Sequence, residues 1–176
     1  MQIRTATRSD ADEVRGVHLS AFPKGEGEIV SRLAVDLLSH ESTPPTISLV
    51  AEVDGLAVGH VACSPVVVEG SRDFQGYILA PLGVRSDYQK RCIGSRLVES
   101  GMQRLSDMAV GVLFVYGDPK YYGRFGFNAE AAAGYVPAHT LQYPFGWQAV
   151  VLSAPGAKRS PSRITCVASL NDPALW

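Results

Sequence analysis

The stretch from Gly76 to Leu105 constrains the fold of this chain most. An apolar run from Gly76 to Val84 indicates a buried strand, and a short polar turn follows it. The chain then changes to helical spacing, with one apolar face made by Ile93, Leu97, Gly101 and Leu105. The sequence therefore predicts a strand, a basic glycine-containing loop and a helix in direct succession.

The predicted loop, residues 89–95, suits an anion. The first N–H groups of a helix lack intrahelical partners, and the helix dipole places positive charge there, so such an end attracts phosphate. Lys90 and Arg91 add two formal charges, Gly94 leaves room beside the backbone, and Ser95 offers a hydroxyl. An ordinary strand–helix connection with solvated cations fits the same spacing, because one glycine-bearing loop is a weak motif.

Length, charge and cysteine content narrow the class of protein. The 176 residues suit a single domain, residues 1–176, and the net charge of −1 gives no general attraction to nucleic acid or to an anionic membrane. No apolar run approaches the roughly 20 residues of a membrane span, and we find no secretory leader. Cys63, Cys92 and Cys166 are odd in number and far apart, so we expect no metal site and a cytoplasmic location.

The loop carries a family resemblance. Residues 89–94, Gln-Lys-Arg-Cys-Ile-Gly, resemble the Gln/Arg-x-x-Gly-x-Gly/Ala loop of the GNAT superfamily of N-acetyltransferases, which binds the pyrophosphate of acetyl-coenzyme A (acetyl-CoA). Cys92 departs from the motif, because it stands where the first glycine is usual. The departure leaves less room for the pyrophosphate and brings a thiol near the cofactor. The resemblance implies that the cofactor-binding residues here are Gln89, Lys90, Arg91, Cys92, Ile93, Gly94 and Ser95.

A second motif strengthens this resemblance. Residues 121–127, Tyr-Tyr-Gly-Arg-Phe-Gly-Phe, fit the later GNAT pattern Phe-Tyr-x-x-x-Gly-Phe. The longer Gly117–Phe127 segment is similar to the YhbS-like bacterial subfamily of predicted acetyltransferases, and the likeness runs from residue 3 to nearly the end of the chain. It implies an α/β (α+β) GNAT fold, with a mixed, mostly antiparallel central sheet of six to seven strands flanked by about four helices.

The resemblance also implies a reaction, the direct attack of a primary amine on acetyl-CoA through a tetrahedral intermediate. By position, the N–H of Gly83 or Val84 would stabilise the oxyanion, and the pantetheine arm would pair with Leu82 to Val84. Tyr122 would bind the cofactor and donate a proton to the leaving thiolate, since a phenol is protonated at neutral pH. Tyr121 and Tyr122 also fit as core aromatics, and Tyr121 fits that role better.

The acceptor site is less defined. In the resembled family, the segment between the first two helices helps to form it. Here Glu26 and Glu28 would favour a cationic amine, but the same segment also fits an ordinary solvated loop. The amine must lose a proton before it attacks. Glu26, Glu28, His60, Asp118 and a water chain all remain open as the base.

Several local predictions concern other side chains. Asp54-Gly55 predicts a type I′ hairpin turn. Ser9 is predicted to cap the first helix and Asp118 a later one, before Pro119. The remaining expectations are that His18 is a surface or packing residue and that the core or the acceptor-site wall includes Tyr143, Phe145 and Trp147.

Two other classes of protein stay open. One is a non-catalytic acyl-CoA-binding sensing or regulatory module, which the Cys92 departure favours. The other is a structural or interaction domain with an empty loop. The sequence does not define the amine, which fits a small molecule or a protein, or the oligomeric state, for which a homodimer is compatible.

Overall fold

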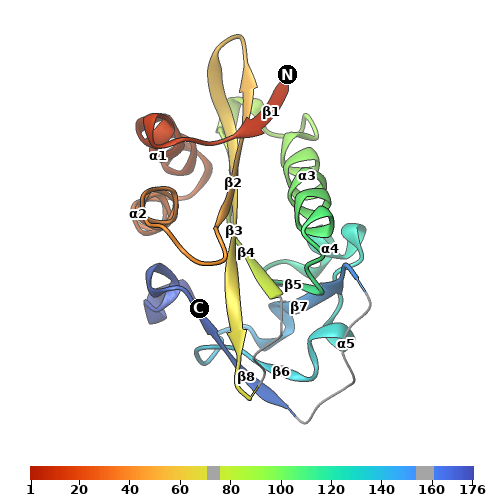
Figure 1. Cartoon of the computed structure of the whole chain (residues 1–176). Coiled ribbons are helices and arrows are strands. Elements are labelled where there is room, and N and C mark those ends of the chain that lie inside the picture. The colour runs from red at the N-terminus through yellow and green to blue at the C-terminus, as the bar shows by residue number, and fades with distance from the viewer. Residues whose placement is uncertain (71–75, 154–160) are drawn as a thin grey trace. The chain divides into compact units, whose positions relative to one another are not determined.

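The computed structural model describes residues 1–70, 76–153 and 161–176. Within these ranges the chain forms eight strands and five α-helices (Figure 1). In chain order they are β1 (Gln2–Thr5), α1 (Ala11–Ala21), α2 (Glu26–Ser39), β2 (Ile47–Val53), β3 (Leu56–Val68), β4 (Gly76–Val84), α3 (Ile93–Asp107), β5 (Val112–Tyr116), α4 (Pro119–Tyr122), α5 (Ala129–Ala132), β6 (Tyr135–Val136), β7 (Trp147–Val151) and β8 (Ser162–Cys166).

The chain divides into two compact units, and each is described by itself. The first comprises Met1–Cys63 and Ala80–Gly101, and the second comprises Ser64–Leu79 and Met102–Trp176. Strands β3 and β4 and helix α3 each contribute residues to both units.

The first unit is built on the strand order β1-β2-β3-β4. β1 runs antiparallel to β2, and β2 antiparallel to β3. The β2–β3 turn has positive φ angles at both central residues, 51° at Asp54 and 79° at Gly55, as a type I′ turn requires. The predicted hairpin is therefore confirmed.

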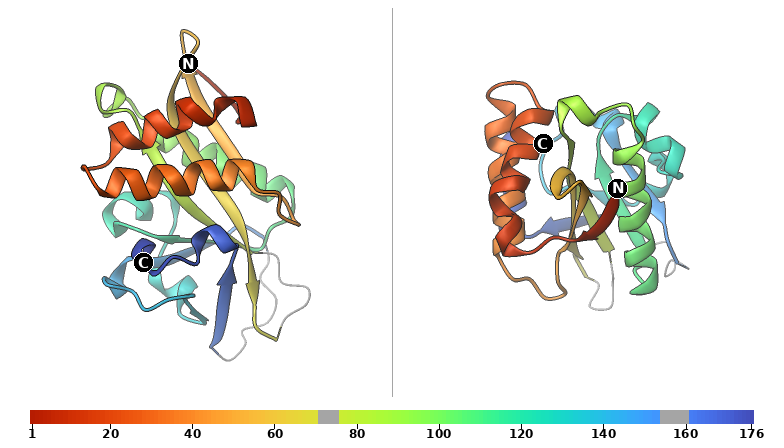
Figure 2. Two further views of the ribbon diagram at one scale, coloured as in Figure 1. Left: turned by 90° about the vertical axis from the view of Figure 1, so that its left-hand side faces the viewer. Right: turned by 90° about the horizontal axis from the view of Figure 1, so that it is seen from above.

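Helices cover both faces of this sheet. α1 and α2 lie side by side on one face, where Val14, Val17 and Ala34 pack against Val50 and Ala57 (Figure 2). The Ile93–Gly101 part of α3 lies on the other face. There Ile93 and Leu97 approach so closely that a Cβ at Gly59 would lie 2.9 to 3.0 Å from them.

The second unit contains the order β4-β5-β7, in which β5 is parallel to β4 and antiparallel to β7. β8 pairs antiparallel with β3 and parallel with β6. The Trp147 ring is buried and stacks on Phe114 at 5.3 Å. Tyr143 and Phe145 are 53% and 68% exposed, so they are not core residues, and their place in an acceptor-site wall stays a prediction. Both lie in or beside a short 3-10 turn before β7 rather than on a strand.

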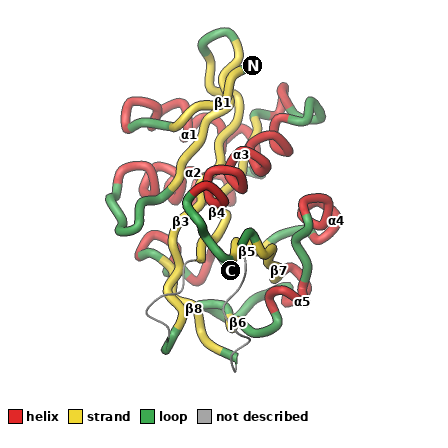
Figure 3. The backbone as a smooth tube through the Cα atoms, turned by 45° about the vertical axis from the view of Figure 1, so that its right-hand side comes forward, coloured by secondary structure: helices red, strands yellow, loops and turns green. Residues whose placement is uncertain are grey.

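The predicted fold class is confirmed, because the sheet is mixed and mostly antiparallel. The described residues contain one strand and one helix more than the predicted six to seven strands and about four helices. The difference comes from very short elements, since β6 has two residues and α4 and α5 have four each. Figure 3 shows these elements by secondary structure. Within the described ranges, no helix combines the length and the apolar character that crossing a membrane requires. Residues 71–75 and 154–160 lie outside the described residues.

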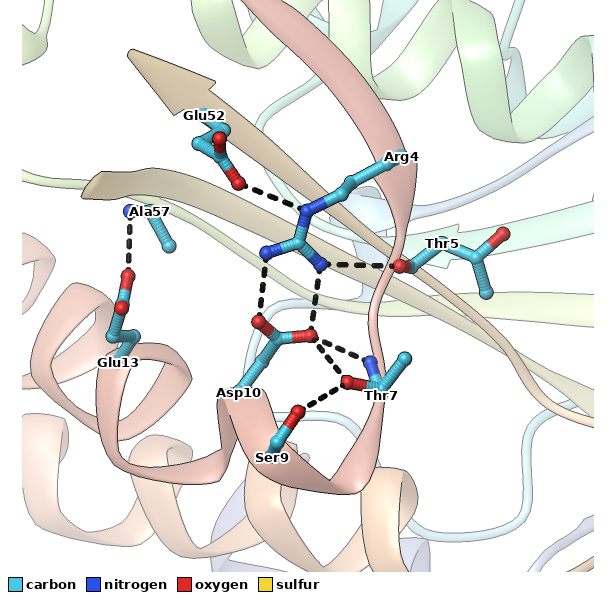
Figure 4. Close-up of polar contacts among 8 residues, drawn as sticks. All are labelled: Arg4, Thr5, Thr7, Ser9, Asp10, Glu13, Glu52 and Ala57. Atoms are coloured by element: carbon cyan, nitrogen blue, oxygen red, sulfur yellow. Dashed lines mark hydrogen bonds and ion pairs between the residues drawn. The ribbon is translucent and has the colours of Figure 1, made fainter. Parts of the chain in front are cut away.

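The start of α1 differs from the prediction that Ser9 is its cap. Thr7 is the N-cap of a 3-10 turn, Arg8–Asp10, that precedes α1, and Asp10 accepts the Thr7 N–H at 2.7 Å (Figure 4). Arg4 binds both Asp10 oxygens, at 2.8 and 2.9 Å, and it also binds Glu52 at 2.9 Å. The Arg4 guanidinium holds the pKa of Asp10 far below its usual range. The ion pair with β1, rather than the local sequence alone, therefore selects the capping residue.

This arrangement predicts that Asp10→Asn lowers the free energy of unfolding by about 1–3 kcal/mol, because a nearly buried charged hydrogen bond is lost. Urea denaturation at neutral pH measures the change. Glu41→Gln is the matched control, since the Arg8–Glu41 pair is exposed at both ends, 68% and 92%, and its loss should have no measurable effect. Equal stabilities of the two variants would contradict this role of Asp10.

Candidate functional site

The loop between β4 and α3 presents backbone N–H groups at its end. α3 begins at Ile93, and the N–H of Arg96 donates to the carbonyl of Cys92 at 3.0 Å, which is the first helical hydrogen bond. The N–H groups of Ile93, Gly94 and Ser95 precede that bond, so they have no intrahelical acceptor. The helix continues to Asp107, which is long enough for its dipole to add positive charge at these groups.

Two loop residues adopt left-handed backbone. Lys90 has φ 60° and Cys92 has φ 59°, a region that costs a residue other than glycine about 1–2 kcal/mol. This gives a physical reason why a glycine is usual where Cys92 stands. Lys90, Arg91 and Cys92 are all exposed, and the Arg91 guanidinium lies over the Tyr88 ring, 5.1 Å from its centroid.

Arg85 fixes the start of the loop. Its backbone N–H donates to Val58 at 2.8 Å, and its side-chain Nε donates to the carbonyl of Ala57 at 2.9 Å. Its guanidinium also lies close to Gly16 of α1. Arg85 could not be recognised from the sequence, because no motif marks a residue whose partners are backbone groups on another strand.

Two further contacts tie the loop to its surroundings. Gln89 donates from its side-chain amide to the carbonyl of Val84 at 3.2 Å. The N–H of Ser86 donates to the hydroxyl of Ser20 on α1 at 3.0 Å. The predicted loop residues are thus held between β4, α3 and α1 within the first unit.

The end of β4 approaches α1 closely. β4 pairs with β5 from Gly76 to Leu79 and then continues to Val84. Gly83 is buried, and a Cβ at this position would lie 2.7 Å from Nδ1 of His18. Only glycine fits there without moving the imidazole, which is the close backbone approach expected of a glycine inside a strand.

A chain of buried polar side chains lies behind Gly83. Nε2 of His18 is 2.8 Å from Nδ1 of His60, and Nε2 of His60 is 2.8 Å from the Ser48 hydroxyl. Both histidines are fully buried, so His18 is a core residue and not a surface one. Among the described residues, Nδ1 of His18 has no hydrogen-bond partner. Burial lowers the pKa of His18 to about 4, and burial together with His18 lowers that of His60 well below its usual value.

The three acidic residues that the sequence singled out have surroundings of their own. Glu26 and Glu28 are exposed in the first turn of α2, where their binding of a substrate stays a prediction. Asp118 accepts the N–H of Lys120 at 2.9 Å, which confirms it as a helix cap. In the part of the chain that is described, no group of three or more His, Cys, Asp or Glu side chains is arranged to bind a metal.

Tyr122 belongs to the second unit, at the end of α4. It is half-buried, and its ring packs against Tyr121 at 5.0 Å and Phe127 at 5.7 Å. A Cβ at Gly117 would overlap the Tyr122 ring, so that glycine is required for this ring position. Tyr121 is also only half-buried, with the Arg124 guanidinium 4.5 Å from its ring centroid, so the reading of Tyr121 as a core aromatic is wrong.

With this fold and these motifs, the chain belongs to the GNAT acetyltransferases. The family model described as an acetyltransferase (GNAT) domain matches residues 2–129. In Escherichia coli K12, the uncharacterized N-acetyltransferase YjhQ is 37% identical over 133 residues, which cover 74% of this chain and 71% of YjhQ. The uncharacterized N-acetyltransferase YhbS of the same strain is 34% identical over 132 residues, which cover 74% of this chain and 75% of YhbS.

Solved structures agree with this assignment. The crystal structure of YhbS from Escherichia coli in complex with CoA has a TM-score of 0.83 and 26% identity, and the match covers 97% of this chain and 92% of that one. A GNAT family acetyltransferase from Brucella melitensis in complex with acetyl-CoA has a TM-score of 0.70 and 30% identity, with 97% of both chains covered.

The buried histidines predict a dependence of stability on pH. An unfolded histidine has a pKa near 6.5, whereas the folded value for His18 is about 4. Between these values the unfolded chain binds more protons, so the free energy of unfolding falls as the pH drops from 7 to 4, by about 3 kcal/mol from His18 alone. Urea denaturation across this range measures the change.

His18→Gln should make this dependence on pH less steep, because a glutamine side chain does not titrate. Asp10 stabilises the fold at neutral pH, and because its pKa is lowered on folding, this stabilisation is lost only as the pH falls below its unfolded value of 3.8. A free energy of unfolding that is constant from pH 7 to pH 4 would contradict the burial of neutral histidines.

Proposed function

We propose that this protein transfers an acetyl group from acetyl-CoA to a primary amine. The observation that carries the proposal is the set of free N–H groups of Ile93, Gly94 and Ser95, which precede the first helical bond of α3 beside the exposed Lys90 and Arg91. Such an end attracts a diphosphate. Relatives with the same fold that are solved with CoA or acetyl-CoA support the choice of ligand.

The residues present fit this cosubstrate. The left-handed backbone at Lys90 and Cys92 turns the chain into α3 so that the loop amides precede its first turn. The Cys92 side chain is exposed, and it leaves less room for the diphosphate than a glycine at this position would. The remaining loop contacts would come from Gln89, Lys90 and Arg91, and the pantetheine arm would pair with Leu82, Gly83 and Val84 at the end of β4.

The strand geometry favours Val84 over Gly83 as the oxyanion donor. Successive N–H groups of a strand point to opposite edges, and the N–H of Arg85 points to β3, where it binds Val58. The N–H of Val84 therefore points away from β3, toward the edge where an acyl chain would add. One such donor to an oxyanion is worth about 2.7–4 kcal/mol.

Tyr122 is the proposed general acid. Acetyl-CoA supplies an activated thioester, and its sulfur needs a proton when the carbon–sulfur bond breaks. A phenol is protonated at neutral pH and can donate this proton. The glycine at residue 117 and the ring of Phe127 fix the direction of the Tyr122 side chain, which supports a positioned donor over a mobile surface tyrosine.

Glu26 and Glu28 are proposed to attract the acceptor. They lie two residues apart at the start of α2 and are exposed, so they would favour a cationic amine over a neutral or acidic one. A small-molecule amine and a protein amine both satisfy this requirement. A non-catalytic acyl-CoA sensor is the second candidate, because Cys92 makes the loop differ from the family pattern at the diphosphate.

The test combines binding and turnover. Calorimetry is expected to show binding of acetyl-CoA, and an amine panel is expected to release free thiol. Tyr122→Phe should lower kcat by about 10²–10⁴-fold, because general acid catalysis is lost, while the Kd for acetyl-CoA changes little. Tyr121→Phe is the matched control, as its hydroxyl has no proposed role.

Each outcome separates the candidate functions. If the protein binds acetyl-CoA but releases no thiol with any amine, the sensor is favoured. If it does not bind acetyl-CoA, a structural or interaction domain is the remaining candidate. Equal kcat values for Tyr122→Phe and the wild-type protein would remove Tyr122 from the mechanism.

A further inference from the structure

The buried acceptor atom on His18 lies beside the proposed site. Its Nδ1 would lie only 2.7 Å from a Cβ at Gly83, and it has no hydrogen-bond partner among the described residues. Polar atoms that are buried in folded proteins nearly always have a partner, so an orphan of this kind calls for an explanation such as a ligand or a catalytic role. Gly83 belongs to the strand end that is proposed to receive the acyl chain.

The two hydrogen bonds of this polar chain allow two placements of the protons. In one, Ser48 donates to His60 and His60 to His18, and an N–H at Nδ1 of His18 is left without an acceptor among the described residues. In the other, Nε2–H of His18 donates to His60 and Nε2–H of His60 to the Ser48 hydroxyl, and a lone pair is left at Nδ1 of His18. That lone pair, on His18, faces Gly83.

We propose that Nδ1 of His18, in the tautomer that leaves it a lone pair, accepts a proton from the attacking amine nitrogen, with His60 and Ser48 as the positioning residues that hold the ring in place. The inference rests on the proposed acetyl transfer. It replaces the four side chains that the sequence left open as bases. The structure places Glu26 and Glu28 at an exposed helix start and Asp118 in a cap, and both ring nitrogens of His60 already have hydrogen-bond partners.

The protons balance across the reaction. An ammonium acceptor loses one proton to solvent, and the free amine then forms the carbon–nitrogen bond. The nitrogen becomes far more acidic once that bond exists, and its second proton passes to Nδ1 of His18. The carbon–sulfur bond breaks with its electron pair on sulfur, which takes the proton of Tyr122. The imidazolium then returns one proton to the phenolate through solvent, which restores both side chains.

A neutral imidazole is suited to this task. A positively charged side chain at this position would repel an ammonium acceptor, whereas a bare ring nitrogen attracts its N–H groups. The second imidazole can share the incoming charge, because the Nε2 proton of His18 can move along the 2.8 Å hydrogen bond to His60.

His18→Gln is the first test. The glutamine amide can keep the contact with His60 but removes the lone pair at Nδ1. We expect kcat for the best amine to fall about 10²-fold or more, with the Kd for acetyl-CoA within about threefold of the wild-type value. His40→Gln is the matched control, because it makes the same chemical change at an exposed site. Equal kcat values for His18→Gln and the wild-type protein would overturn the inference.

Chemical rescue separates proton transfer from a structural role. In His18→Gly, added imidazole is expected to restore kcat in a saturable way, and a series of imidazoles of similar size should give rates that rise with their basicity. Rescue that is independent of basicity, or none in a variant that still binds acetyl-CoA, would contradict proton transfer. Should His18→Gly fail to fold, the series can be applied to His18→Ala.

These outcomes are distinct from a failure of the proposed function. A wild-type protein that releases no thiol with any amine would refute acetyl transfer itself. An active wild-type protein with a fully active His18→Gln variant would refute only the role of His18.

Discussion

The backbone amides at the start of α3 can bind a ligand well only if the chain before them is fixed. Arg85 supplies this constraint, since its backbone and side chain both donate to β3, at 2.8 and 2.9 Å. Gln89 and Ser86 add bonds to β4 and α1. The N–H groups at the start of α3 are therefore held in place by contacts that involve neither the Lys90 nor the Arg91 side chain.

The same strand end connects the loop to the buried histidines. Gly83 allows the backbone of β4 to contact His18, and the hydrogen bonds of His18 reach β3 and β2 through His60 and Ser48. Burying two neutral imidazoles costs free energy as the pH falls, which a purely apolar core would avoid. A role in proton transfer gives a reason for this cost.

Local patterns predicted much of this fold. The Asp54-Gly55 turn, the Asp118 cap and the start of α3 at Ile93 each depend on residues within a few positions. The family motifs added the mixed sheet, whereas the binding of a cosubstrate by the loop stays a prediction. The predicted Ser9 cap was wrong, because Thr7 and Asp10 are selected by an ion pair with Arg4.

The roles of distant residues could not be predicted in this way. His18 and His60 are 42 positions apart, and a lone histidine on a helix gives no sign of a partner on a strand. The Arg85 side chain binds a backbone carbonyl, a group that every residue has, so no residue type in the sequence marks its partner. Tyr143 and Phe145 were expected in the core or in an acceptor-site wall, and the core alternative fails because they lie in and beside a turn that exposes them.

The most direct test of the central claim is a titration of ¹⁵N-labelled protein with CoA, followed by amide NMR. The account predicts that the amide signals of Ile93, Gly94 and Ser95 are among those that shift most, and that pantetheine, which lacks the diphosphate, leaves them in place. CoA binding that leaves these three amides unchanged while others shift would contradict the account.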